Sequence, residues 1–264
     1  MILISYWDLA TLSILVFLLG IFLWLSGFSR VKGLWFGTVR MIVQLLFMGV
    51  WLSYVFNADN PIWILLVGTV MLAAAGYEIT KRQQYRFKKL NGYLVGFLAL
   101  SMTSLVLLVG VLTLIIQPEP WYEPQYAIPL LGMLLGNSMT AIGLGLDAMT
   151  KSAIESKAKI EAQLALGKTA KQSLDFIRQK SLHAALIPVT NMLVAAGIIS
   201  LPGMMTGQIL AGADPMEAVK YQIMIMLLIA TSSGFGTLIA IRLASKRLFD
   251  SRDRLTLHVL EKQL

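Results

Sequence analysis

The sequence predicts an all-α, polytopic membrane protein with about seven transmembrane helices, an N-terminus outside and a C-terminus in the cytoplasm. Three observations support this fold class. Hydrophobic residues make up 57% of the 264 residues and charged residues only 14%, whereas an ordinary soluble domain is about 25% charged. The apolar residues gather in runs that match the thickness of a bilayer. The lysines and arginines collect in alternate loops, as they do in proteins that cross a membrane repeatedly.

Seven apolar stretches are long enough to cross a bilayer, which requires roughly 20 residues. The first stretch lacks a basic start and a small-residue cleavage site, so we interpret it as a retained span rather than a signal peptide. Little of the chain is left for a soluble catalytic domain, and we predict one transmembrane domain over residues 1–264. The predicted spans are 8–25, 34–56, 61–78, 92–116, 128–148, 184–201 and 217–241.

The connecting loops alternate in charge. The first, third and fifth loops and the tail are basic, whereas the second loop around Asp59, the fourth and the sixth contain no lysine or arginine. Of all the lysines and arginines, only Arg40 and Lys220 fall within or at the edge of a span. The positive-inside rule places the basic loops in the cytoplasm, and the alternation favours an odd number of spans. The net charge of +8 therefore indicates membrane topology and no nucleic-acid partner.

The later spans contain residues that interrupt helices. Pro129 and Pro188 could produce broken or re-entrant helices, and residues 200–215 form a break rich in Gly, Pro and Met. Irregular backbone at membrane depth is tolerated only where it is buried in protein or lines a cavity. The break is therefore a candidate outer gate or pathway lining, with Pro202 and Gly203 as its structural or gating residues.

A charged segment at 151–182 lies between two predicted spans. It contains Gly167-Lys168-Thr169, which resembles the end of a phosphate-binding loop. The full pattern needs a glycine five residues before Gly167, where this chain has Ala162, and a preceding strand. We therefore interpret the motif as a glycine break in a cytoplasmic helix and predict no ATP-hydrolysing site in this chain.

The same segment has the pattern of a docking element. Ala170, Leu174 and Ile177 lie on one helix face, at positions i, i+4 and i+7, which suits the groove of a partner protein. The alternative is a helix that lies on anionic lipid.

The residues before this face carry a partial motif. Glu161 and Gly167 partly match the loop by which many ABC importer permeases contact their ATPase, although Gln163 replaces an expected alanine. The predicted coupling residues are Glu161, Gly167, Leu174 and Ile177.

Polar residues inside spans need partners. Arg40 and Gln44 lie one helical turn apart in the second span, where a charge at the bilayer centre costs about 2.5–3.5 kcal/mol. Both are candidate structural or gating residues. Methionine thioethers suit soft metal ions but more often fill cores, and without cysteine the metal ligands stay unknown. Asp147 could line the inner mouth of a cation pathway or face basic residues. The predicted pathway residues are Asn137, Met139, Asp147, Asn191, Met204 and Met205.

Several runs together carry a family resemblance. They are Ile128-Pro-Leu-Leu-Gly-Met133, Gly136-Asn137, Ala184-Ala-Leu-Ile-Pro188, Ser200-Leu-Pro-Gly-Met-Met-Thr-Gly207 and Asp214-Pro215. In this order they resemble the FetB-type permeases of bacterial iron-export ABC transporters, a family related to plant membrane subunits linked to aluminium tolerance. Arg40 and Gln44 fall where that family has an Arg-x-x-x-Gln pattern. The resemblance covers the chain from about residue 34 onward.

This resemblance implies a permease subunit in the bacterial inner membrane that exports iron or a related metal cation. It implies a separate FetA-like ATP-binding subunit, with ATP bound there and no cofactor in this chain. It also implies a permease homodimer in a complex of two permeases and two ATPases. Two rivals stay open: an ion-coupled secondary metal transporter or channel without an ATPase, and a structural or sensory membrane subunit. An enzyme is disfavoured because no nucleophile–base set or metal triad appears in one layer.

Overall fold

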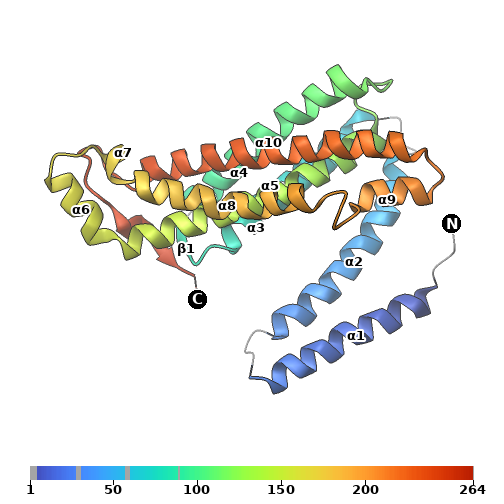
Figure 1. The fold of residues 1–264 in the computed structure, drawn as a ribbon, viewed down its shortest axis with the longest axis horizontal. Helices are drawn as coiled ribbons and strands as arrows, with labels where there is room; N and C mark the ends of the chain where they lie inside the picture. Colours follow the sequence, from blue (N-terminus) through green and yellow to red (C-terminus); the bar gives the residue numbers. More distant parts are fainter. Residues whose placement is uncertain (1–4, 28–30, 57–59, 89, 264) are drawn as a thin grey trace. The chain divides into compact units, whose positions relative to one another are not determined.

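The structure is a computed structural model that describes residues 5–27, 31–56, 60–88 and 90–263. These residues are almost entirely helical, so the predicted all-α class is confirmed (Figure 1). The sequence predicts one domain, whereas the contacts divide the chain into two compact units, Met1–Asn60 and Pro61–Leu264. Arg30, Asp59 and Lys89, which belong to the predicted charge pattern, lie outside the described residues.

The N-terminal unit consists of two helices that pack together, α1 (Tyr6–Leu25) and α2 (Val31–Phe56). Ser5 begins α1 with a capping box, in which its hydroxyl accepts from the Trp7 amide and Asp8 accepts from the Ser5 amide. Gly20 lies directly against the indole of Trp35, where a side chain would collide. This glycine therefore sets how closely the two helices approach.

The second unit contains the remaining elements. They are α3 (Pro61–Lys81), β1 (Tyr85–Phe87), α4 (Leu90–Val111), the π-helical turn η1 (Leu112–Ile116), α5 (Pro124–Glu155), α6 (Lys157–Ala165), α7 (Ala170–Ser173), α8 (Asp175–Ala195), α9 (Gly203–Leu210), α10 (Pro215–Arg247), the 3-10 turn η2 (Leu257–Val259) and β2 (Leu260–Lys262). Helix α5 lies at the centre and contacts α3, α4, α8 and α10. The buried core of the unit is built around these contacts.

Helices α5 and α10 are longer than a bilayer requires. Both begin with proline at the first turn, and the Asp214 carboxylate caps α10 by accepting from the amides of Met216 and Glu217 at 2.9 and 3.1 Å. They contain 32 and 33 residues, which at about 1.5 Å per residue makes each roughly 50 Å long. The hydrocarbon core is about 30 Å thick, so both helices extend beyond it.

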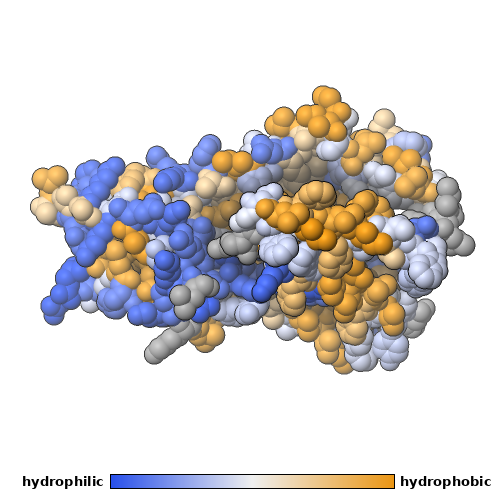
Figure 2. Space-filling view, turned by 90° about the horizontal axis from the view of Figure 1, so that it is seen from below, coloured by the Kyte–Doolittle hydropathy of each residue, from blue (hydrophilic) through white to orange (hydrophobic). Residues whose placement is uncertain are grey.

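The basic segments of this unit lie at one end. Strand β1, in the turn between α3 and α4, pairs antiparallel with β2 near the C-terminus, with Arg86 opposite Glu261. The backbone amide of Gln84, in the same turn, donates to the Asp147 carboxylate of α5 at 2.6 Å. Hydrophilic side chains gather over the end that holds α6, α7 and the C-terminus (Figure 2). We refer to this end of the second unit as the basic end.

Six helical stretches among the described residues are long and apolar enough to cross a membrane: α1, α2, α3, Gly92–Ile116, α5 and α10. The prediction of seven spans is therefore not confirmed, because the stretch 184–201 is not one of the six. The helix in that region, α8, begins at Asp175 in the charged segment and ends at Ala195. Only its second half is apolar, and the residues that follow leave the helix.

Helices α8 and α9 nevertheless connect the two ends of the unit. Arg178 of α8 lines the same groove as Arg242 near the end of α10, whereas Met204 of α9 lines a hollow with Tyr221 near the start of α10. The chain therefore passes from the basic end to the opposite end between α5 and α10. It does so with an incomplete helix and a short one instead of a single long span.

The proline and glycine interruptions have different outcomes. Pro129 and Pro188 lie inside continuous helices, so the prediction that they break the helices is wrong. The predicted break at 200–215 contains the short helix α9, which lies between two turns. Gly197 in the turn before it and Gly212 in the turn after it have positive φ angles of 88° and 93°. Pro202 caps α9 and Gly203 is its first residue.

Candidate functional site

The most exposed feature of the basic end is the elbow formed by α6, residues 166–169 and α7, which projects at one extremity of the second unit in Figure 1. Helix α6 ends in a Schellman motif: the Gly167 amide donates to the Leu164 carbonyl and the Lys168 amide to the Gln163 carbonyl. Gly167 has φ of 82°, a conformation that costs other residues about 1–2 kcal/mol.

The next residues begin the second helix of the elbow. The Thr169 hydroxyl accepts from the Gln172 amide, and Gln172 Oε1 accepts from the Thr169 amide, which is a capping box. The Gly-Lys-Thr motif is therefore a helix stop followed by a helix start. A helix end followed by a helix start is enough to explain the resemblance to a phosphate-binding loop.

The surface of the elbow is polar and well exposed. Glu161 lies on α6 with its carboxylate 3.8 Å from the ammonium of Lys157, and both side chains are exposed. The Lys159 ammonium lies 4.1 Å from the centre of the Phe176 ring, which ties α6 to the start of α8. A hollow of about 370 Å³ lies between them, lined by Gln163, Lys168, Gln172, Asp175 and Phe176.

The apolar face predicted for a partner does not lie on this surface. Leu174 and Ile177 are 1% and 0% exposed and belong to the core of the second unit. The expected i, i+4, i+7 residues do not form one helix face, because α7 ends at Ser173 and α8 begins at Asp175, and Leu174 and Ile177 pack against the chain itself. The prediction that these two side chains contact a partner is therefore wrong for this arrangement, whereas Glu161 and Gly167 are exposed.

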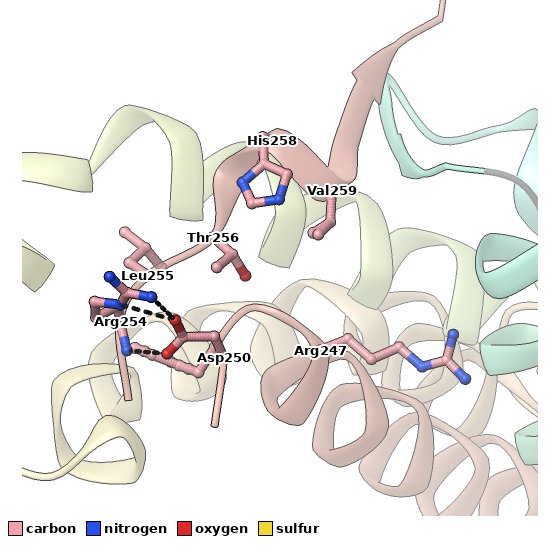
Figure 3. Close-up of a pocket in the computed structure, with 8 residues that line it drawn as sticks. Arg247, Asp250, Arg254, Leu255, Thr256, His258 and Val259 are labelled. Carbon is pink, nitrogen blue, oxygen red and sulfur yellow. Dashed lines mark hydrogen bonds and ion pairs between the residues drawn. The ribbon is translucent and has the colours of Figure 1, made fainter. Parts of the chain in front are cut away.

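The C-terminal segment folds back against the basic end. Figure 3 shows the Asp250 carboxylate bonded to Arg254, with the Arg247 side chain directed away from this pair. The backbone hydrogen bond from Arg254 is the main cause of a lowered pKa of the Asp250 carboxyl. Because the folded-state pKa is lowered, the turn gains stability above the ordinary carboxyl pKa and loses it as the pH falls through the lowered value.

The opposite end of the unit contains a hollow of about 350 Å³. It brings together the end of α4–η1, the starts of α5 and α10, and α9, through Met133, Met204, Gln208, Tyr126 and Tyr221 among other residues. The Gln208 side-chain oxygen is buried and has no hydrogen-bond partner among the residues that the structure describes. Two thioethers and an amide oxygen that lacks a partner therefore surround one space, and Met204 is the predicted pathway residue that lies there.

The other predicted pathway residues do not gather at this hollow. Asn137 donates to the Met133 carbonyl of its own helix at 2.9 Å, and Met139 packs against the core. Met205 neighbours Met204 but does not line the hollow. Asn191 lies on an exposed face of α8.

Asp147 has a structural task at the basic end. Its carboxylate accepts the 2.6 Å hydrogen bond from the Gln84 amide, so it holds the turn between α3 and α4 against α5. Of the two readings that the sequence left open, a contact with the basic side of the protein matches this position. A role in a pathway stays a prediction.

Arg40 and Gln44 belong to the N-terminal unit. They lie one turn apart on α2, as predicted, and both side chains are exposed in this chain. Their assignment as structural or gating residues stays a prediction.

A cluster of hydroxyl groups lies inside the second unit and is not among the predicted site residues. The Ser138 hydroxyl donates to Ser232 at 2.8 Å, Ser104 lies 3.3 Å from Ser232, and Ser233 lies 3.4 Å from Ser138. All four residues are fully buried. Hydroxyl pairs of this kind join helices across a membrane interior. The sequence signal that could have found them is a pair of serines, 232 and 233, inside an otherwise apolar span.

A dedicated metal centre is not evident in the described part of the chain. Among these residues, no group of three or more His, Asp or Glu side chains could hold a metal ion. The soft and neutral donors of the hollow around Met204 are the nearest alternative.

The fold and these sites define a multi-pass, all-helical membrane protein with an exposed polar elbow at one end and a small hollow at the other. Its family follows from comparison with known proteins: the chain belongs to the uncharacterised protein family UPF0014, which it matches over residues 6–249. The membership agrees with the predicted resemblance.

Three relatives show the breadth of the family. A UPF0014 membrane protein of Synechocystis is 39% identical over 84% of this chain and 85% of its own length. The probable iron export permease protein FetB of Escherichia coli is 33% identical over 85% and 84%. The protein ALUMINUM SENSITIVE 3 of Arabidopsis thaliana is 32% identical over 83% and 78%. No solved structure gives a significant match to the chain.

Proposed function

We propose that this chain is the membrane permease subunit of an ABC transporter that exports iron or a related metal cation. ATP would be bound and hydrolysed by a separate, FetA-like subunit, and this chain would need no cofactor of its own. The observation that carries the proposal is the exposed elbow, which joins α5 to α8 at the hydrophilic end of the unit (Figure 2). The similarity to FetB over most of both chains supports it.

The elbow suits the transmission of force. Helix α6 follows α5 after a single residue, and α8 likewise follows α7 after a single residue. A partner that moves the elbow therefore pulls on two helices that contact each other and α10 along their lengths. In the proposed cycle, ATP-driven closure of the partner changes the packing of these helices and alternately opens the two ends.

The hollow around Met204 is the proposed outer section of the pathway. Its thioethers, amides and phenols are neutral donors that suit transient contact with a cation, since a strongly charged cage would retain the ion. Of the predicted pathway residues, Met204 has the strongest structural support. Asn137, Met139, Asp147 and Asn191 are retained as weaker candidates, whereas Met205 does not line the hollow and is given no role in it.

The proposed assembly is a permease homodimer with two ATP-binding subunits in a bacterial inner membrane. The family and the candidate spans support a multi-pass membrane location, and the bacterial relatives support the inner membrane. An ion-coupled secondary metal transporter or channel without an ATPase is the second candidate, because the neutral side chains that line the hollow would also let a cation pass without ATP hydrolysis.

Reconstitution with and without the ATP-binding subunit separates these candidates. Liposomes that contain both subunits should show iron-stimulated ATP hydrolysis and ATP-dependent iron movement, while the permease alone should move no iron under an imposed gradient. Gradient-driven movement by the permease alone would establish the second candidate. If another cation stimulates ATP hydrolysis and iron does not, the proposed substrate is wrong but the proposed ABC transporter stands.

A matched pair of substitutions tests the pathway. Met204→Leu removes the thioether that lines the hollow, whereas Met205→Leu removes a neighbouring thioether that does not line it. We expect Met204→Leu to lower the iron-stimulated rate several-fold and Met205→Leu to leave it within twofold. Equal effects of the two variants would show that the hollow is not the pathway.

A further inference from the structure

A second groove at the basic end has the chemistry of an anion site. It has a volume of about 650 Å³ and lies between α7, the start of α8 and the last turns of α10. Four cations from three helices line it, namely Lys171, Arg178, Arg242 and Lys246. Like-charged side chains repel one another, so their convergence on one hollow calls for a negative ligand.

Most of this positive charge is not neutralised within the protein. Lys171, Arg242 and Lys246 make no ion pair or side-chain hydrogen bond with any residue of the described ranges. Arg178 pairs with Asp175 at 3.2 Å, while its Nε is buried without a partner in the described part of the chain. The cations of the groove therefore keep donors available for a ligand.

The groove also contains two carboxylates, which have different effects. Asp250 is held by Arg254 at 2.8 Å, and Figure 3 shows both of its oxygens engaged by this residue. Its charge is therefore already compensated. Asp253 lies at the rim, exposed, on a residue with φ of 54°. The groove therefore holds one uncompensated carboxylate against three unpaired cations, so it stays positive.

The remaining walls of the groove are apolar. Leu174 lies buried at its base, and the partly buried side chains Ile239, Leu243 and Phe249 line the α10 side. A free phosphate ion would leave this surface unused. A ligand that joins a phosphate to a hydrocarbon part would use both halves of the groove.

The position along α10 matches the headgroup layer of a bilayer. Helix α10 begins at Pro215, and roughly 20 residues cross the hydrocarbon core. Ile239–Lys246 therefore follow the point where the helix leaves the hydrocarbon at the basic end. The cytoplasmic leaflet carries anionic lipids, and basic pockets at this depth bind their headgroups.

We propose that this groove binds the phosphate headgroup of an anionic phospholipid, with the adjoining glycerol and acyl chain against the wall formed by Ile239, Leu243 and Phe249. A segment of a partner protein is the competing occupant. The elbow contributes only Ala170 and Lys171 to the groove, and the apolar wall on the α10 side lies outside the elbow, which favours the lipid here. The inference requires a membrane protein whose basic end faces the cytoplasm, as the charge alternation predicts, and does not depend on the proposed transport activity.

The test measures lipid binding to the purified full chain by native mass spectrometry during titration with phosphatidylglycerol or phosphatidylcholine. The variant Arg242→Gln with Lys246→Gln removes two groove cations. At about 1 kcal/mol for each cation, or about fivefold, it should weaken phosphatidylglycerol binding roughly 25-fold. Phosphatidylcholine should bind the unmodified chain far more weakly, and millimolar inorganic phosphate should not displace phosphatidylglycerol.

Two further variants control for charge and folding. Lys180→Gln with Lys262→Gln removes two exposed cations outside the groove and should change binding less than twofold. The exchange Arg242→Lys with Lys246→Arg keeps the charge and should restore binding, which separates charge loss from misfolding. If Lys180→Gln with Lys262→Gln weakens phosphatidylglycerol binding as much as the groove pair does, the effect comes from general surface charge and the proposal is wrong. Displacement by inorganic phosphate would identify a free-anion site instead. If the Gln pair abolishes ATP-binding-subunit association and leaves lipid binding intact, the occupant is the partner protein.

Discussion

Small and hydroxyl-bearing residues determine how closely the helices of the second unit approach. A Cβ at Gly145 of α5 would lie 2.9 Å from Thr237 of α10 and 3.2 Å from Ala185 of α8. The hydroxyls of Ser138 and Ser232 bridge the same two long helices, α5 and α10, at 2.8 Å. Close packing and interhelical hydrogen bonds replace the hydrophobic effect as the cohesive forces inside a membrane.

Gly145 provides a direct test of this packing. Gly145→Ala should lower the stability of the chain by about 1–3 kcal/mol, because the added methyl group has no space between α8 and α10. Gly143→Ala is the matched control, since Gly143 is buried in the same helix and no atom lies within 4 Å of its added Cβ. Thermal unfolding in detergent should show a lower midpoint for Gly145→Ala only. Equal midpoints would mean that α5 shifts freely and that the contact is not limiting.

At the scale of elements, the elbow depends on backbone conformation more than on side-chain contacts. Gly167 ends α6 in the left-handed region and Thr169 starts α7 two residues later. The turn between α6 and α7 therefore depends on a single glycine in the left-handed region. Helix α8 starts in this charged region, which is why it lacks the long apolar run of the other spans.

The elbow geometry can be tested without changing any exposed functional group. Gly167→Ala should strain the turn by about 1–2 kcal/mol and weaken association with the ATP-binding subunit about five- to thirtyfold. Gly27→Ala introduces the same change at a glycine with φ of 80° in the N-terminal unit, where an added Cβ also has open space. It should leave the affinity unchanged in a binding titration. A normal affinity for Gly167→Ala would remove the elbow from the proposed interface.

For the molecule as a whole, one exposed face of α8 combines apolar side chains with a polar one that a single chain leaves uncovered. Ile187, Asn191 and Val194 share an exposed face of α8, and Asn191 makes no hydrogen bond with any described residue. An amide exposed to lipid is unfavourable, so this face fits burial against a second copy. The proposed homodimer supplies that copy.

The absence of cysteine from the chain allows a clean cross-linking test. Asn191→Cys should give a covalent dimer with a short bis-maleimide in native membranes, because equivalent residues meet near a twofold axis. Val106→Cys lies on α4 at 67% exposure and serves as the control that should stay monomeric. A dimer from Val106→Cys and none from Asn191→Cys would place the interface on another face.

Much of this protein could be predicted from local patterns. Long apolar runs and the charge alternation predicted five of the six helical stretches that can cross a membrane closely in position, and the sixth, α5, in part. The predicted seventh span, 184–201, was not confirmed, because α8 begins in a charged segment. Hydropathy also does not reveal that Leu174 and Ile177 are buried in the chain's own core. Pro129 and Pro188 were expected to break helices, but neighbouring helices support the backbone around them.

The sequence by itself determined the helical membrane class, the family and the segregation of basic residues, because these depend on hydropathy, charge and motif order along the chain. The folded structure alone shows which residues meet: Met133 with Met204 at one end, Ser138 with Ser232 inside, and Lys171 with Arg242 at the other end. Residues far apart in sequence become neighbours only when helices pack, and periodicity within one helix does not specify which partner its face will contact.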